Sequence, residues 1–204
     1  MNNTWNELAN DVVIKNTIES LKKNGINAEL VKTRDEAKKK VLSLIPEGAE
    51  VMAMTSVSLD TINIPEEIKS GNYNSVREKL YSMDRETHGR ETQKLGAAPE
   101  YAIGSVNAVT EDGKVIIASN TGSQLSAYAY GSSKVVWVVG TQKIVKNIEE
   151  GMKRIYEHSL PLESERAKKA YEVPGSSVNK ILIVNKEIQQ NRIHIIFVNE
   201  QLGF

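Results

Sequence analysis

The sequence lacks cysteine, an excess of either charge and any long apolar run. Without cysteine, its 204 residues cannot form disulfides, supply a thiolate nucleophile, or hold zinc or an iron–sulfur cluster through sulfur. Lysine plus arginine and aspartate plus glutamate number 26 each, so the concentrated positive field of a nucleic-acid binder is absent. No apolar stretch approaches the roughly 20 residues that cross a bilayer. Together with an N-terminus that lacks a signal-peptide layout, these absences predict a cytoplasmic protein without nucleic-acid or membrane partners.

Helix-like and strand-like patterns alternate along most of the chain. Apolar residues recur at helical spacing in segments that begin near Ile14, Ala37, Val76 and Ile144. Compact apolar strands are expected at residues 26–31, 50–54 and 135–139. Because no linker is long or polar enough to divide the chain, we expect a single α/β domain over residues 1–204, with a mostly parallel sheet flanked by helices.

Antiparallel additions to this sheet are expected in two places. Glu111-Asp112-Gly113 separates two strand-like runs, and Asp-Gly is a strong hairpin signal. Two more strands, at residues 180–187 and 192–200, are close in sequence and are expected to pair. Before them, the helix that starts near Ile144 should end close to His158, where an imidazole suits the helix dipole, with a break at Pro161.

Two strand-to-helix junctions carry small and hydroxylated residues. One is the stretch ASNTGSQLSAYAYG at residues 118–131, and the other follows the strand at 50–54. Ligands of open α/β sheets bind beyond the carboxyl ends of the strands, where free backbone N–H groups at a helix start favour anions. The predicted ligand-binding residues at these junctions are Thr55, Ser56, Asn120, Thr121, Gly122, Ser123 and Gln124. Helix capping uses the same residue types without a ligand, so both interpretations remain open.

A polar cluster, THGRETQK, is the second candidate site. His88 and Glu91 could move a proton and are the predicted catalytic residues, while Arg90 and Lys94 could bind an anion. A solvated helix end explains the same residues, although the internal Gly89 weakens such a helix. Lys143, just past a strand end, could also reach an anion or simply begin a helix. Three scattered histidines show no metal-ligand spacing, so neither a metal nor another cofactor is predicted.

Several longer motifs together resemble the LUD-domain family, the lactate-utilisation proteins. They are GSVNAVTEDGK, SNTGSQLSAYAYGSSKVVWVVGTQKIV, RIYEHSLPLESERAKKAY and RIHIIFVNEQLGF, in that order. The resemblance implies an α/β fold like that of sugar-phosphate isomerases, CoA transferases and formyltetrahydrofolate cyclo-ligases. It also implies that the Asn120-Thr121-Gly122-Ser123 turn lies at the ligand end of the sheet.

Three functions remain open on this basis. The resemblance implies an accessory or regulatory component of lactate utilisation (L-lactate to pyruvate) that binds an anionic small molecule and works with iron–sulfur partner proteins. Some longer relatives carry a cysteine cluster where this chain has EVPGSSVNK, so a redox centre would lie in another chain. A stand-alone transferase, ligase or isomerase for a phosphate- or CoA-bearing substrate is the alternative. The third is a homo-oligomeric binding protein without turnover, whose interface could be supplied by the paired C-terminal strands and the segment SLPLESERAKKAYEVPG.

Overall fold

A six-stranded parallel sheet forms the centre of the protein, whose computed structural model describes residues 3–84 and 86–204. Residues 1, 2 and Arg85, the last of which belongs to the polar stretch before THGRETQK, lie outside the described residues. The strand order is β1-β10-β7-β4-β2-β3, and every neighbouring pair is parallel. The strands are β1 (Asn27–Val31), β10 (Ile193–Val198), β7 (Lys134–Gly140), β4 (Tyr101–Gly104), β2 (Glu50–Ala53) and β3 (Asn74–Ser75). The predicted α/β architecture with a mostly parallel sheet is confirmed.

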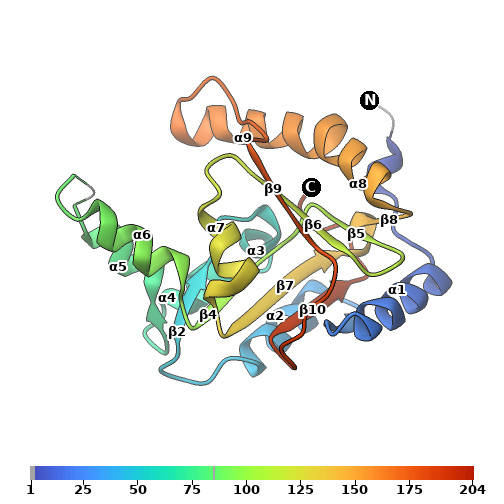
Figure 1. Ribbon diagram of the computed structural model, residues 1–204, viewed down its shortest axis with the longest axis horizontal. Coiled ribbons are helices and arrows are strands. Elements are labelled where there is room, and N and C mark those ends of the chain that lie inside the picture. Colours follow the sequence, from blue (N-terminus) through green and yellow to red (C-terminus); the bar gives the residue numbers. More distant parts are fainter. Residues whose placement is uncertain (1–2, 85) are drawn as a thin grey trace.

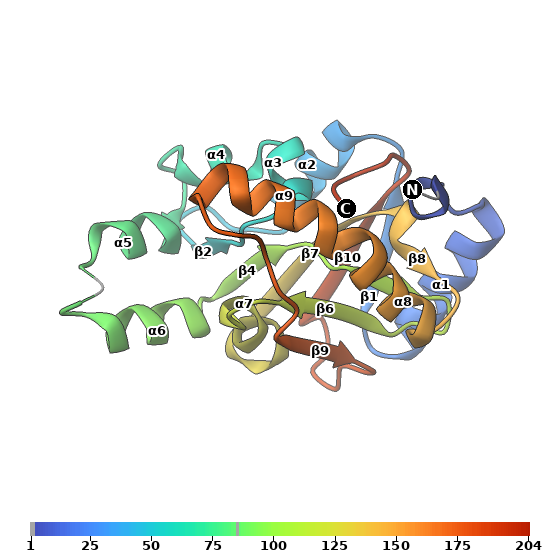
Figure 2. The same ribbon diagram turned by 90° about the horizontal axis from the view of Figure 1, so that it is seen from above.

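A smaller mixed sheet of four strands lies against one face of the parallel sheet (Figures 1 and 2). Its order is β8-β5-β6-β9, with β8 (Ile144–Val145), β5 (Ala108–Thr110), β6 (Val115–Ser119) and β9 (Lys180–Val184). The expected hairpin is confirmed, since β5 and β6 are antiparallel around Asp112-Gly113. The C-terminal strands do not pair with each other: β9 pairs with β6, and β10 lies between β1 and β7. Five of six β10 residues are buried and none of β9 is, so β10 occupies the core of the larger sheet.

Helices cover both faces of the parallel sheet. On one face, α2 (Arg34–Ser43), α3 (Val57–Thr61) and α4 (Ile64–Lys69) pack on alternate residues of the strands, such as Val136 and Val138. The other residues of β7, among them Trp137, face α1 (Asp11–Lys23), the mixed sheet and the π-helical turn η2 (Ala127–Gly131) that follows α7 (Ser123–Ser126). Because strand side chains alternate between faces, each apolar strand serves both cores.

A long helical segment covers the outer face of the mixed sheet. It comprises α8 (Ile148–Arg154), the π-helical turn η4 (Ile155–Ser159) and α9 (Leu160–Tyr171) without interruption. Two expectations about it were wrong. Ile144 belongs to β8 rather than to the helix, and Pro161 does not break it. The proline lies in the first turn of α9, directly after the π turn, where its missing N–H is tolerated.

The helices α5 (Val76–Ser82) and α6 (Gly89–Ala97) project from one side of the molecule as an arm (Figures 1 and 2). Val76 is the buried residue of α5, and none of the residues in α6 is buried. Short 3-10 turns, η1 (Asn3–Asn6) and η3 (Thr141–Lys143), complete the described elements.

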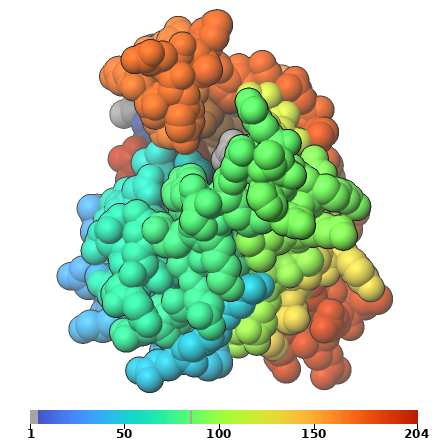
Figure 3. Space-filling model, turned by 90° about the vertical axis from the view of Figure 1, so that its left-hand side faces the viewer, coloured from blue at the N-terminus to red at the C-terminus, as the bar shows by residue number. Residues whose placement is uncertain are grey.

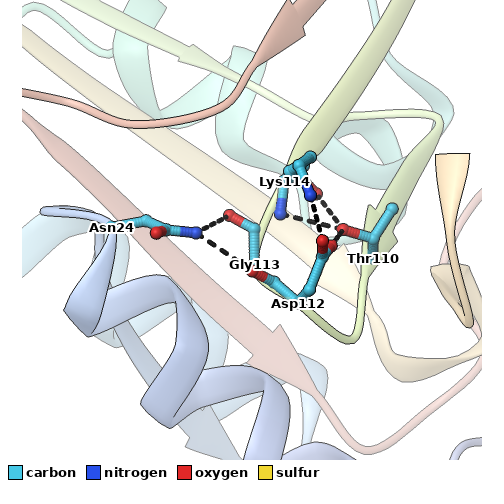
Figure 4. Close-up of polar contacts among 5 residues, drawn as sticks. All are labelled: Asn24, Thr110, Asp112, Gly113 and Lys114. Atoms are coloured by element: carbon cyan, nitrogen blue, oxygen red, sulfur yellow. Dashed lines mark hydrogen bonds and ion pairs between the residues drawn. The ribbon is translucent and has the colours of Figure 1, made fainter.

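The hairpin of the mixed sheet is attached to the end of α1 by one side chain (Figure 4). Asn24 Nδ2 donates to the carbonyl oxygens of Asp112 and Gly113, both at 3.0 Å. Within the turn, Thr110 Oγ1 donates to Asp112 Oδ1, and Lys114 Nζ pairs with the same carboxylate. Asn24 therefore joins the C-terminal end of α1 to the hairpin of the mixed sheet.

We expect Asn24→Ala to lower the free energy of unfolding by about 1–3 kcal/mol, because two carbonyl groups lose a protein donor. Urea denaturation measures this change, and amide exchange at Gly113 should accelerate. Asn72→Ala, at an exposed position, is the control. An unchanged midpoint for Asn24→Ala would show that the hairpin holds its place without this contact.

Candidate functional site

The carboxyl ends of the parallel strands meet at one edge of the large sheet, as they must when all strands run the same way. Thr55 and Ser56 follow β2, Ser105 follows β4, and the turn η3 with Lys143 follows β7. Three of the predicted ligand-binding residues, Thr55, Ser56 and Lys143, thus lie at this edge. The candidate site is built around Lys143.

The Lys143 side chain is buried, with 2% of its surface exposed. Its Nζ lies 3.1 Å from Ser58 Oγ and 3.2 Å from Ser105 Oγ. Leu202 and Gly203 cover the amine on one side: Ser58 Oγ donates to Leu202 O, and a Cβ at Gly203 would lie 3.4 Å from Nζ. Burial, with the nearby charge of Arg154, holds the pKa of the amine well below its usual value of 10.5. Lys143 lies in the 3-10 turn η3 and does not begin an α-helix.

Arg154 contributes a second buried cation, from the end of α8. Its side chain is fully buried, and Nη1 donates to Asn107 O at 2.7 Å and to Ser159 Oγ at 3.1 Å. Nε and Nη2 have no hydrogen-bond partner among the residues that the structure describes. Burial lowers the pKa of the guanidinium to about 10.

Neither Lys143 nor Arg154 has a counter-ion among the residues that the structure describes. Across residues 3–84 and 86–204, none of the ion pairs joins either side chain to a carboxylate. A buried charge without a partner is destabilising, whereas the same charge beside a bound anion is compensated. The pair therefore has the chemistry of an anion site.

His158 adds a third nitrogen to this cluster. It lies inside the helical segment, in η4, and not at a helix end as expected, because the helix continues through Pro161. Its buried Nε2 has no partner within the described part of the chain. Burial is the largest cause that lowers its pKa, followed by the charges of Arg154 and Lys143.

This arrangement predicts a specific pH dependence. Because the pKa of His158 in the folded protein is below the usual 6.5, the unfolded chain binds more protons as the pH falls through that value. The histidine therefore lowers stability below about pH 6.5, and we expect His158→Asn to lose less stability than wild type between pH 7 and about pH 5. His194 contributes part of the loss of stability that remains in this variant, since burial also lowers the pKa of His194.

Thermal unfolding across this pH range tests the prediction, with the exposed His88 replaced in the control variant His88→Asn. If the unfolding temperatures of wild type and His158→Asn changed with pH in the same way, the burial of His158 and its buried cationic neighbours would not lower the pKa of the imidazole.

The predicted anion loop at residues 120–124 lies after β6. Gly122 has a left-handed φ of 84°, and a Cβ there would lie 2.6 Å from Lys180 Cδ. The loop donors are used locally: Gly122 N donates to Ser119 Oγ, Ser123 N to Thr121 Oγ1, and Ser119 Oγ to Gln124 Oε1.

Two residues at the start of the neighbouring strand, Asn179 just before β9 and Lys180 in it, also bond to this loop. Asn120 Oδ1 accepts from Asn179 Nδ2, and Lys180 Nζ donates to Thr121 O. Asn107 links the strand that precedes this loop to one of the buried cations, because its Oδ1 accepts from Ala118 N in β6 while its carbonyl accepts from Arg154 Nη1. The role of the loop in anion binding stays a prediction.

A hollow opens between α9 and the residues of α3 to α5, which Figure 3 shows below the orange helix. Arg77 of α5 donates to Ala53 O at the end of β2 and, through Nη2, to Thr55 Oγ1 at 3.1 Å. Ser56 is the N-cap residue of α3 but makes no side-chain cap bond. Asp60 of α3 has a pKa raised by burial, although the charges of Arg77 and Arg166 act in the opposite direction.

The other predicted cluster lies apart from the buried cations, on the projecting arm. His88 is the N-cap residue of α6, and its Nδ1 is 2.8 Å from Thr87 Oγ1. Arg90 Nη1 donates to Gln93 Oε1, while Glu91 and Lys94 are exposed. α6 packs against α5 and α7. A catalytic role for His88 and Glu91 therefore remains a prediction about the arm.

Sequence reasoning missed Ser58, Ser105, Arg154 and the involvement of His158 in the cluster. One signal was available: Arg154 and His158 are four residues apart and share a face of a helix that is otherwise apolar there. The described residues contain no group of three or more acidic or histidine side chains that could hold a metal ion. Among them, too, no helix has the length and apolar character of a membrane span.

Comparisons with known proteins agree on one fold. The LUD domain matches the sequence over residues 14–198. Among solved structures, the chain is similar to a DUF162 family protein from Deinococcus radiodurans, with a TM-score of 0.57 and 10% sequence identity, over 95% of this chain and 100% of that one. A comparison with curated proteins gives no match.

Proposed function

The chain belongs to the LUD-domain family, which is associated with lactate utilisation, and from this premise we propose that it is an accessory or regulatory component of the oxidation of L-lactate to pyruvate. In this role it binds an anionic small molecule at the carboxyl end of the parallel sheet. Lys143 and Arg154 supply the positive charge. Residues 120–124, the loop that follows β6, are the second part of the proposed site.

One observation carries this proposal. Lys143 Nζ contacts Ser105 Oγ and Arg154 Nη1 donates to Asn107 O, so both buried basic side chains meet the same short connection, and neither has a carboxylate partner within the described ranges. Arginine and lysine are rarely buried without a partner. A bound carboxylate or phosphate would satisfy the free N–H groups of Arg154 and offset the cost of burying both charges.

The chain has no cysteine with which to hold an iron–sulfur cluster, so electron transfer in this process would belong to partner proteins. We expect co-purification of such partners from the native cell, and impaired growth on L-lactate after deletion of the gene. Normal growth together with the absence of any partner would argue against a role in lactate utilisation.

Anion binding is tested by thermal unfolding with L-lactate, pyruvate, oxalate, phosphate and acetyl-CoA. A ligand at 100 times its dissociation constant stabilises the folded state by about 2.7 kcal/mol. We expect at least one anion to stabilise wild type but not Lys143→Met. Lys180→Met removes the cation beside Gly122 and therefore tests whether the loop at residues 120–124 binds the anion.

The two variants separate the two parts of the site. Loss of stabilisation in Lys180→Met alone would place the ligand at the loop and contradict the role of Lys143. If none of the anions stabilises wild type, the anion-binding proposal fails.

A further inference from the structure

We propose that Lys143 forms an imine with the carbonyl group of a small oxo acid whose carboxylate is bound by Arg154. This inference rests on the proposed function, because it uses the same anion site. It goes further in assigning a covalent step and a substrate class, the compounds that carry both a carbonyl group and a carboxylate.

The surroundings of the amine are those of a nucleophile. Two hydroxyl groups, of Ser58 and Ser105, lie within hydrogen-bond distance of Lys143 Nζ, and none of its contacts is to a carboxylate. Only a neutral amine can attack a carbonyl carbon, and the lowered pKa of Lys143 favours that form. Ser105 is partly exposed, whereas Ser58 is buried.

The free edge of Arg154 fits a carboxylate. The two nitrogens without partners, Nε and Nη2, form one side of the guanidinium fork, while Nη1 is held by Asn107 and Ser159. Arg166 shows this mode of binding in the same protein, since its Nε and Nη2 each donate to one oxygen of Glu163 at 2.7 Å. A ligand carboxylate can occupy the equivalent edge of Arg154 in the same bidentate manner.

The step balances without an oxidant or reductant. The lone pair of Nζ attacks the carbonyl carbon, and a nitrogen–carbon bond forms as the carbonyl oxygen takes up a proton. The carbon–oxygen bond then breaks, and the oxygen leaves as water with the two protons of the amine. The resulting imine gains one further proton from solvent and becomes a cation beside the bound carboxylate. The Ser105 hydroxyl, in contact with Nζ, is placed to relay these protons.

Imine formation would give the site a selectivity that charge alone cannot. A hydroxy acid and the corresponding oxo acid have the same carboxylate, so Arg154 binds both. Only the oxo acid has a carbonyl carbon for the amine, so only it is held covalently.

Reductive trapping tests the inference on the intact chain. Wild type is incubated with pyruvate and cyanoborohydride, and the modified residue is identified by peptide mass spectrometry. L-lactate, which has the carboxylate without a carbonyl, and acetone, which has a carbonyl without the carboxylate, are the control compounds. Lys143→Met and Lys146→Met are matched variants, since Lys146 is an exposed lysine three residues away.

We expect a reduced adduct on Lys143 with pyruvate in wild type and in Lys146→Met, at least tenfold above that with acetone, and none with L-lactate. Stabilisation by L-lactate or oxalate without any adduct would overturn the imine and leave the anion site intact. Equal labelling of several lysines would overturn it as well. Absence of both adduct and stabilisation would overturn the inference together with the anion-binding part of the proposed function.

Discussion

Alanine in place of Gly25 is expected to lower the free energy of unfolding by at least about 3 kcal/mol, whereas alanine in place of Gly48 should cost only about 1–2 kcal/mol. Both glycines have a left-handed φ, 79° and 78°, so both substitutions strain the backbone to the same extent. Only Gly25 has a neighbour in the way: a Cβ there would lie 2.0 Å from the carbonyl oxygen of Glu187, while nothing lies within 4 Å of a Cβ at Gly48.

The location of Gly25 explains the size of the effect. It turns the chain from α1 into β1, and the segment between β9 and β10 crosses directly over it, with Glu187 N donating to Asn24 O at 2.8 Å. Because the obstructing atom is backbone, no side-chain rotation can relieve the contact. Urea denaturation of both variants measures the difference, and equal costs would show that the crossing segment can shift away freely.

The sequence predicted those features of the fold that depend on local chemistry. Thr33, three residues before Glu36, fits the pattern of a helix cap, and its Oγ1 accepts from Glu36 N at 3.2 Å. Asp112-Gly113 does form a hairpin. The alternation of apolar strands with helices led correctly to a parallel sheet, because a helix can return the chain to the same edge between two strands, as α2 does between β1 and β2.

The choice of partner for each strand could not be predicted in the same way. The strands at residues 180–184 and 193–198 are close in sequence, which favours a pair, yet they belong to different sheets. Burial decides this outcome: β10 is apolar enough to be covered on both faces, while β9 is not. A pattern that extends over one strand contains no information about which distant strand will bury it.

The same distinction applies to the site. Lys143, Thr55 and Ser56 were identified because each follows a strand, and strand ends are visible in sequence. Arg154 was missed, because its role depends on the helix α8 lying over the connection between β4 and β5. Its neighbour His158 was seen but assigned to a helix end, since the π turn that carries the helix past Pro161 has no clear sequence signal.

Replacement of Lys143 by methionine is expected to abolish anion binding and at the same time to raise the stability of the ligand-free protein, by about 1–4 kcal/mol at neutral pH. Methionine fills a similar volume without a charge, so the cost of burying the amine disappears. The pKa of Lys143 in the fold is well below 10.5, so the unfolded chain binds more protons than the folded protein below that pH, and the lysine destabilises the fold there. The gain should therefore shrink as the pH approaches 10.5.

Chemical denaturation of both proteins from pH 6 to about pH 10 measures this gain, with Lys146→Met as the control for removing one exposed charge, expected to change stability by less than about 0.5 kcal/mol. Greater stability combined with lost binding is the signature of a residue kept for its ligand, since a lysine retained for packing would instead destabilise the protein when replaced. A less stable Lys143→Met variant would therefore mean that the contacts with Ser58 and Ser105 outweigh the cost of the buried charge. In that event the argument for a bound anion would depend on Arg154 alone.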